Sequence, residues 1–167
     1  PREISPEIFV WDQVIKSIAE TSEGRDTIGL LLGSGKPATE SESASVIIDG
    51  IVPPKKLNPS NIELTSTVLS ELMEDWSDNH LDQIIVGWFR TWSDPPQQTR
   101  LHKGDPTAHK EFFKKPHQVV LSFSQKGTDT NVGLFKSDQG SLNWQRDYPF
   151  IELSSSPAST LAIRNLN

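Results

Sequence analysis

Blocks of apolar residues separated by polar stretches predict a succession of short strands and helices. The densest run, residues 84–89 (IIVGWF), is typical of a strand buried on both faces. Residues 27–33 (TIGLLLG) predict a second buried strand, in which Gly29 indicates that a neighbour closely approaches the backbone of this strand. Further strands are expected at residues 45–51, 119–123, 131–135 and 143–148, and residues 8–10 fit either an edge strand or the entry to a helix.

Three helices are expected between these strands. Asp12 is suited to cap the first helix, which Gly24 would end. Residues 65–76 place apolar side chains at helical spacing and predict the second. The pair Asp105-Pro106 predicts the third, with Asp105 as the cap and Pro106 at the first helical position.

This order of elements predicts one domain of the α/β (α+β) class, a mixed sheet flanked by helices. The domain would span residues 1–153, followed by a polar C-terminal tail at 154–167. Residues 34–45 are small and polar, as in a hairpin connection, and three prolines in residues 52–62 favour an extended loop.

The charge and composition narrow the functional classes. A formal net charge of -6 opposes binding to nucleic acid and to anionic membranes, because both rely on basic surfaces. The absence of cysteine excludes disulfides, thiolate metal sites and a cysteine nucleophile. No apolar run approaches the roughly 20 residues that span a bilayer, and the first residues lack the pattern of a signal peptide. We therefore expect a soluble, intracellular protein, most simply a cytoplasmic one.

Three motifs, in order, resemble those of the MPN domain, the fold of the JAB or JAMM metalloproteases, which include deubiquitinases and their inactive partners. The segment DTIGLLLG at residues 26–33 is similar to the acidic, glycine- and leucine-rich strand of that family. The segment IVGWF at 85–89 is similar to the strand that ends in its His-x-His-Pro motif, and LHKGD at 101–105 stands where the family has Leu-Ser-x-x-Asp. The resemblance covers roughly residues 8–135 and implies an MPN-like sheet.

Carried over position by position, the resemblance implies that most of the family's zinc site is lost. The general-base glutamate corresponds to Asp26, and the third metal ligand is retained as Asp105. The other four positions are replaced: the two histidine ligands by Arg90 and Trp92, the motif proline by Ser93, and the serine that assists the oxyanion by His102.

Neither replacement of a histidine ligand can bind a metal, because arginine stays protonated and indole has no free donor pair. One carboxylate does not hold a catalytic zinc, which needs about three protein ligands. An aspartate before a proline is also a common helix cap, which favours a capping role for Asp105. Arg90 is expected to pair with Asp26 or Asp105 in the space of the absent metal. The sequence therefore predicts no catalytic residue, no metal and no cofactor.

An alternative is a rearranged metal site built from Asp26, His102, Asp105 and His109. Such a site would support a metal-dependent isopeptidase or peptidase. Against it, His102 and His109 lie in a stretch rich in lysine, which is typical of a solvated basic helix face.

We expect instead a catalytically inactive domain that acts as a protein-protein interaction or scaffold module. The resemblance implies a protein partner, for example an active JAMM-type protein or a second MPN domain in a homo- or heterodimer. The expected contact residues are Trp92, Pro95, Pro96, Arg100 and Lys103. Trp92 has an equal alternative, in which its indole folds back and fills the vacated metal pocket. A receptor that uses the emptied cleft for a small molecule or peptide is a third class.

Overall fold

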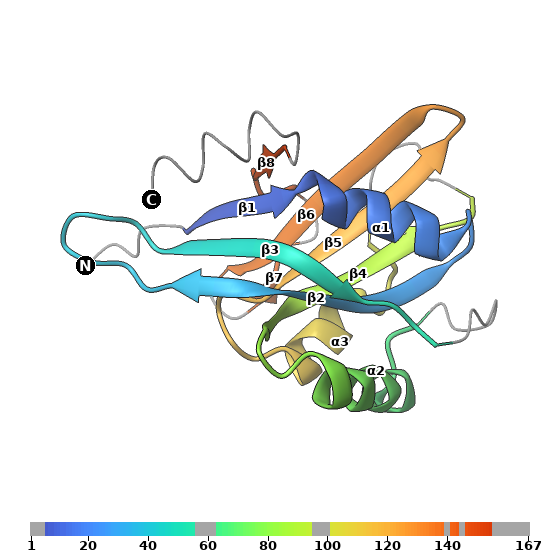
Figure 1. Cartoon of the computed structure of the whole chain (residues 1–167), viewed down its shortest axis with the longest axis horizontal. Helices are drawn as coiled ribbons and strands as arrows, with labels where there is room; N and C mark the ends of the chain where they lie inside the picture. The colour runs from blue at the N-terminus through green and yellow to red at the C-terminus, as the bar shows by residue number, and fades with distance from the viewer. Residues whose placement is uncertain (1–5, 56–62, 95–100, 139–140, 144–145, 155–167) are drawn as a thin grey trace.

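The structure, a computed structural model, describes residues 6–55, 63–94, 101–138, 141–143 and 146–154. Within those ranges the chain forms three helices and eight strands (Figure 1). In chain order they are β1 (Glu7–Trp11), α1 (Asp12–Ser22), β2 (Thr27–Lys36), β3 (Ser45–Val52), α2 (Ser66–Asn79), β4 (Ile84–Trp92), α3 (Asp105–Phe112), β5 (Val119–Lys126), β6 (Asp129–Asp138), β7 (Ser141–Leu142) and β8 (Ile151–Leu153).

The strands of the described ranges form one mixed sheet in the order β7-β6-β5-β4-β2-β3-β1-β8. The pairs β4/β5, β1/β3 and β1/β8 are parallel, and the remaining pairs are antiparallel. Strands β4 and β2 are therefore central, as their continuous apolar runs require. The expected single α+β domain with a mixed sheet flanked by helices is confirmed. The predicted tail begins with Ser154, and the rest of it lies outside the described residues.

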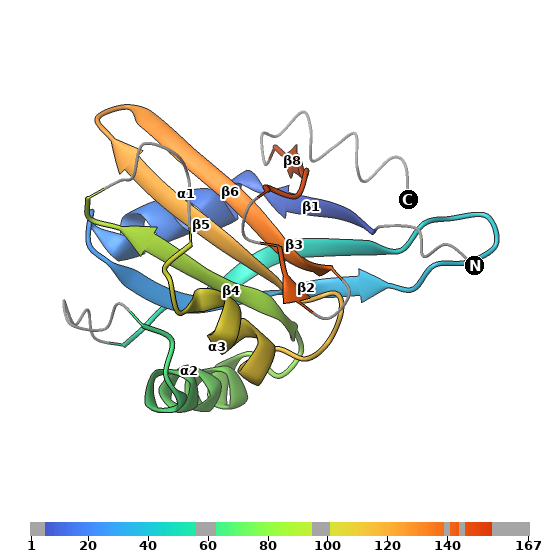
Figure 2. The ribbon, with the colours of Figure 1, turned by 180° about the vertical axis from the view of Figure 1, so that it is seen from behind.

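Each face of the sheet carries its own apolar core. Helix α1 packs Val14 and Ile18 against one face, with Phe89 of β4 beneath it. On the other face α2 contributes Leu72 and α3 is followed by Phe113, and both join the core around Trp88. Figures 1 and 2 show α2 and α3 next to each other, apart from α1. Successive side chains of β4 thus enter opposite cores, which explains its nearly unbroken apolar sequence.

A bulge in β4 sets which residues face α3. The register between β2 and β4 shifts where Leu31 lies opposite Gly87 and Leu32 opposite Ile85. Gly87 has φ +152, and a Cβ at this position would collide with the Val119 carbonyl of β5. Only glycine tolerates both conditions. The bulge places Trp88, and with it every second residue that follows, on the face that carries α3.

Several predicted boundaries were wrong. Helix α1 begins at Asp12 itself, and Trp11 is its N-cap residue, so Asp12 does not cap it. Strand β2 continues to Lys36, past Gly33, because β3 pairs with it as far as Ser45. The strand expected at residues 143–148 is not formed by those of its residues that the structure describes; the pairing partner of β6 is β7 instead.

The close approach predicted at Gly29 is confirmed. A Cβ there would collide with the ring of Phe89 on β4.

Among the described residues, no helix has both the length and the apolar character needed to cross a bilayer.

Candidate functional site

Strand β4 continues to Trp92, three residues past the predicted strand at 84–89, so Arg90 and Trp92 lie on the strand itself. Arg90 is paired with Ile28 of β2 on one side and with Ser122 of β5 on the other. Because alternate residues share a face, Trp88, Arg90 and Trp92 form a row beneath α3. The carbon at the centre of the Arg90 guanidinium lies 5.8 Å from the ring centre of each of the two tryptophans.

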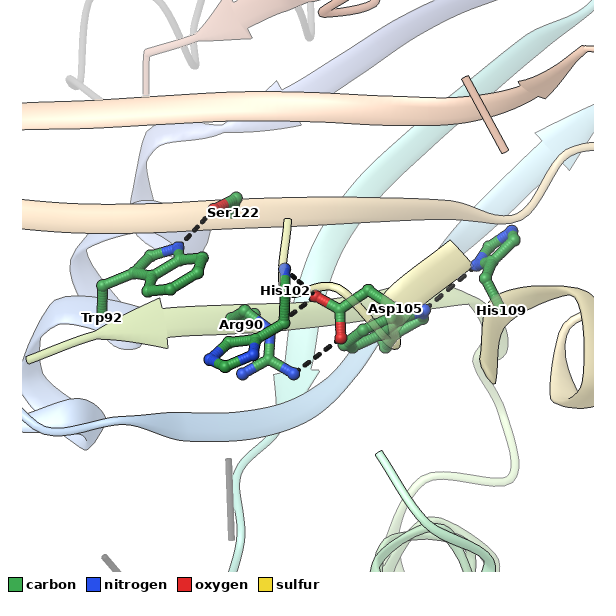
Figure 3. Close-up of polar contacts among 7 residues, drawn as sticks. Arg90, Trp92, His102, Asp105, His109 and Ser122 are labelled. Carbon is green, nitrogen blue, oxygen red and sulfur yellow. Dashed lines mark hydrogen bonds and ion pairs between the residues drawn. The ribbon is translucent and has the colours of Figure 1, made fainter. Parts of the chain in front are cut away.

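The central interaction of the site is a buried ion pair between Arg90 and Asp105 (Figure 3). Arg90 donates from Nε to Oδ2 and from Nη2 to Oδ1 of Asp105, both at 2.7 Å. Both side chains are 1% exposed. Such a two-point contact is the strongest geometry available to an arginine and a carboxylate. Of the two partners expected for Arg90, the structure selects Asp105.

The expectation that Asp105 caps helix α3 was wrong. The N-cap residue is Gly104, and no side chain caps the helix there. Asp105 is the first helical residue, and its Oδ2 also accepts a hydrogen bond from the His102 backbone N–H at 2.8 Å. Its carboxylate therefore joins strand β4 to the segment before α3, a role that its spacing before Pro106 did not reveal.

Asp26, the second acidic position of the site, is engaged by Ser93. The backbone N–H of Ser93 donates to Oδ1 at 2.9 Å, and its hydroxyl lies 3.0 Å from Oδ2. The two residues are exposed relative to the ion pair and join the end of β4 to the start of β2.

Trp92 and His102 form a third pair. Their rings stack with centroids 4.9 Å apart and planes inclined by 7°. The Trp92 indole N–H donates to the Ser122 hydroxyl at 2.8 Å (Figure 3). Both rings are half-buried, so Trp92 is packed along one side and reaches solvent along the other. Trp92 is thus packed in part, as expected if its indole folds back, and exposed in part, as expected of a contact residue.

His109 does not lie on a solvated face, contrary to the expectation for its helix. It is 1% exposed, its Nδ1 accepts a hydrogen bond from the Trp88 indole at 3.0 Å, and its ring stacks on Phe113. Its Nε2 is buried and has no hydrogen-bond partner among the described residues. Burial lowers the pKa of His109 to about 4, and the main chain of Gln118 opposes that shift only in part. The imidazole is therefore neutral near pH 7.

The four residues of the rearranged metal site each have a different neighbour: Ser93 for Asp26, Trp92 for His102, Arg90 for Asp105, and Trp88 for His109. In the part of the chain that the structure describes, no three His, Asp or Glu side chains are placed to hold one metal ion. The residues that the resemblance aligns with the zinc ligands do not fit that ion, because the Arg90 cation occupies both oxygens of Asp105.

The expected contact surface is described only in part. Lys103 is exposed beside the Trp92 and His102 stack, whereas Pro95, Pro96 and Arg100 lie outside the described residues. Sequence reasoning missed Trp88 and Ser122 as members of the site. The period-two spacing of Trp88, Arg90 and Trp92 was the available signal for the first.

Comparison with protein-family models and with curated proteins gave no match to this sequence. The fold is similar to that of many solved structures. One is the solution structure of protein DSY2949 from Desulfitobacterium hafniense, with a TM-score of 0.59 and 11% sequence identity. The match covers 90% of this chain and 96% of that chain. At this identity the similarity shows a shared fold and nothing about activity.

Proposed function

We propose that the chain is a catalytically inactive domain of the MPN type that acts as a protein-protein interaction or scaffold module. The proposed partner is a protein, for example an active JAMM-type protein or a second MPN domain. The observation that supports the proposal most directly is the buried two-point contact between Arg90 and Asp105. Arg90 stands where the resemblance requires the first histidine ligand, and Asp105 where it requires the aspartate.

The chemistry of this pair disfavours zinc. Zinc binding would require the guanidinium to leave a buried carboxylate, which costs several kcal/mol when one partner of such a pair is left behind. The cation would also remain beside the incoming ion and repel it. Both carboxylates of the degenerate site accept hydrogen bonds from protein donors, Asp105 from Arg90 and Asp26 from Ser93. The resemblance aligns Arg90 with a metal ligand and Ser93 with the motif proline.

A rearranged metal-dependent peptidase is the second candidate, but the tautomer of His109 disfavours it. The Nδ1 of His109 accepts from the Trp88 indole, so the neutral ring carries its proton on Nε2, which leaves no free lone pair for a metal ion. Stoichiometric zinc in the purified protein that is lost in His109→Gln would support this candidate and overturn the inactive one.

The positional argument is tested by restoring the ligands. The variant Arg90→His/Trp92→His would present two imidazoles next to Asp105, and we expect it to bind one zinc ion and gain thermal stability on zinc addition. The wild-type protein is expected to do neither. The matched control adds Asp105→Asn to the double variant and should lose the zinc response. A folded double variant that ignores zinc would show that these positions do not correspond to the family's ligands.

The binding role is tested at Trp92. We expect Trp92→Ala to weaken capture of the partner from native extract by more than tenfold, about the loss typical of an aromatic interface anchor. The control is Trp92→Phe, which keeps a ring to stack on His102. Thermal unfolding of each variant separates a lost contact from a lost fold, and unchanged capture by a folded Trp92→Ala would exclude this surface.

A further inference from the structure

Basic side chains gather where α3 ends and β5 begins. Lys110 lies in the last turn of α3, and Lys114 and Lys115 follow the helix; all three are exposed. His117, half-buried, comes next, and Lys136 joins them from β6. We refer to these five residues as the basic corner.

The fold brings the two segments of the basic corner together. Val119 of β5 is paired with Lys136 of β6, so Lys136 lies beside the residues that lead into β5. The turn before β5 is fixed at both ends, because Lys115 N–H donates to the Gln118 side chain and Gln118 N–H donates to the Lys115 carbonyl, each at 3.1 Å. Strand β7, which pairs with β6, lies against α3, as Figure 2 shows.

The charges within the corner repel one another. The pKa of His117 is lowered first by burial and then by the cations of Lys115 and Lys136. Lys136 is also held in place, with its Nζ 5.8 Å from the centre of the Tyr148 ring and 3.3 Å from the Ser137 carbonyl. Clustered like charges lower stability, so the gathering of these cations on one surface favours a role in binding.

The chain as a whole makes the cluster more unusual. The net charge is -6, and α2, on the same side of the sheet, exposes Glu71, Glu74 and Asp78. Among the described residues, Lys16 and Arg90 form ion pairs, with Asp12 and Asp105, whereas the exposed Lys110, Lys114 and Lys115 at the end of α3 form none with a described residue.

We propose that the basic corner receives the carboxylates of an acidic segment of a partner protein. The inference deepens the proposed binding role and rests on it. It assigns a second contact surface, separate from Trp92, and gives the charge of what docks there.

An acidic protein segment fits this surface better than a nucleic acid does. A duplex carries about one charge per 1.7 Å along its axis, so phosphates beyond the corner would meet a protein surface of the same sign. A short run of Asp or Glu can be no longer than the corner itself, so none of its carboxylates need meet the acidic surface beyond it. The exposed cations are all lysines, which contact carboxylates as point charges and do not need the fixed fork of arginine.

The test uses the full chain and a short poly-glutamate peptide at low ionic strength. Binding is expected to raise the pKa of His117, followed by its imidazole NMR signal, because the peptide offsets the cations beside it. The variant Lys114→Glu/Lys115→Glu is expected to bind about tenfold more weakly. Lys36→Glu/Lys126→Glu changes the net charge equally at exposed sites elsewhere and should bind as the wild type does.

Three results would overturn the inference. These are no binding of the peptide, equal weakening in both double variants, or tighter binding of duplex DNA than of the peptide at matched charge. An unmoved His117 signal during saturable binding would place the peptide elsewhere and count against the corner as well. None of these results bears on the zinc test, so the inference and the inactive-domain proposal fail separately.

Discussion

Removing one partner of the Arg90 and Asp105 pair should destabilise the protein far more than removing both. We consider Arg90→Met, Asp105→Leu and the double variant. Each single change leaves the other charge buried, since Arg90 is 0% and Asp105 is 1% exposed as whole residues. The double variant leaves neither.

The expected magnitudes follow from the contacts. Stranding a buried charge costs about 3–5 kcal/mol. Asp105→Leu also removes the acceptor of the His102 N–H, which adds about 1 kcal/mol. Replacement of the whole pair by apolar side chains of similar size is often neutral, so the double variant should lose only about 1–2 kcal/mol, mostly through that N–H. The two single costs are therefore expected to be strongly non-additive.

The free energy of unfolding is measured by urea titration of all four proteins. Tryptophan fluorescence is a suitable probe because Trp88 and Trp92 flank the guanidinium. The slope with urea must be the same in all four proteins for the values to be compared. A domain of this size has about 5–15 kcal/mol in total, so a single variant is expected to be close to unfolding.

An exposed pair provides the control. Lys16 Nζ lies 3.8 Å from Asp12 Oδ2, with the lysine side chain 70% exposed, so Lys16→Gln should cost less than about 0.5 kcal/mol. Single variants at Arg90 and Asp105 that cost no more than this, or costs that simply add in the double variant, would refute the argument that the buried pair organises the site.

Two further predictions concern stability. The native pKa of His109, about 4, lies below its ordinary value of 6.5. Between these two pH values the unfolded chain binds a proton that the folded protein does not. The free energy of unfolding should therefore be at its full value above pH 6.5 and fall by about 3 kcal/mol toward pH 4. In His109→Gln, which keeps an acceptor for the Trp88 N–H, urea titrations at pH 7 and 5 should differ less than in the wild type; an equal difference would assign the pH dependence elsewhere. Gly87→Ala should lower the free energy of unfolding by about 3 kcal/mol or more, measured by thermal or urea unfolding, because of the positive φ at this position and the nearby Val119 carbonyl. The control is Gly104→Ala, which has open space for the new Cβ and should change stability by less than about 1 kcal/mol. Equal costs in the two variants would contradict the prediction.

The sequence predicted the sheet better than its edges. Apolar runs located β2 and β4, since a strand covered on both faces must be apolar throughout. The end of β4 was placed too early, at residue 89, because the apolar run stops at the charged Arg90. Its burial depends on Asp105, which lies 15 residues further along the chain.

The site was also predicted only in part. The sequence indicated that Arg90 pairs with a carboxylate, and left Asp26 and Asp105 as the two candidates. Only the fold shows that Ser93 engages Asp26 and thereby leaves Asp105 to Arg90. His109 was misread because lysines surround it in sequence; its partner, Trp88, lies 21 residues earlier on β4. Contacts of this separation have no local signature.

The three pairs of the site have a consequence for the connection between β4 and α3. The chain leaves the sheet at Ser93, which is bonded to Asp26, and approaches α3 at His102, which contacts Trp92 and Asp105. Since the ends are already fixed, the entropy of closing the connection grows slowly, by about 0.6 kcal/mol for each doubling of its length. The connection between Asp94 and Leu101 can therefore be lengthened with little loss of stability, because contacts outside it hold both of its ends.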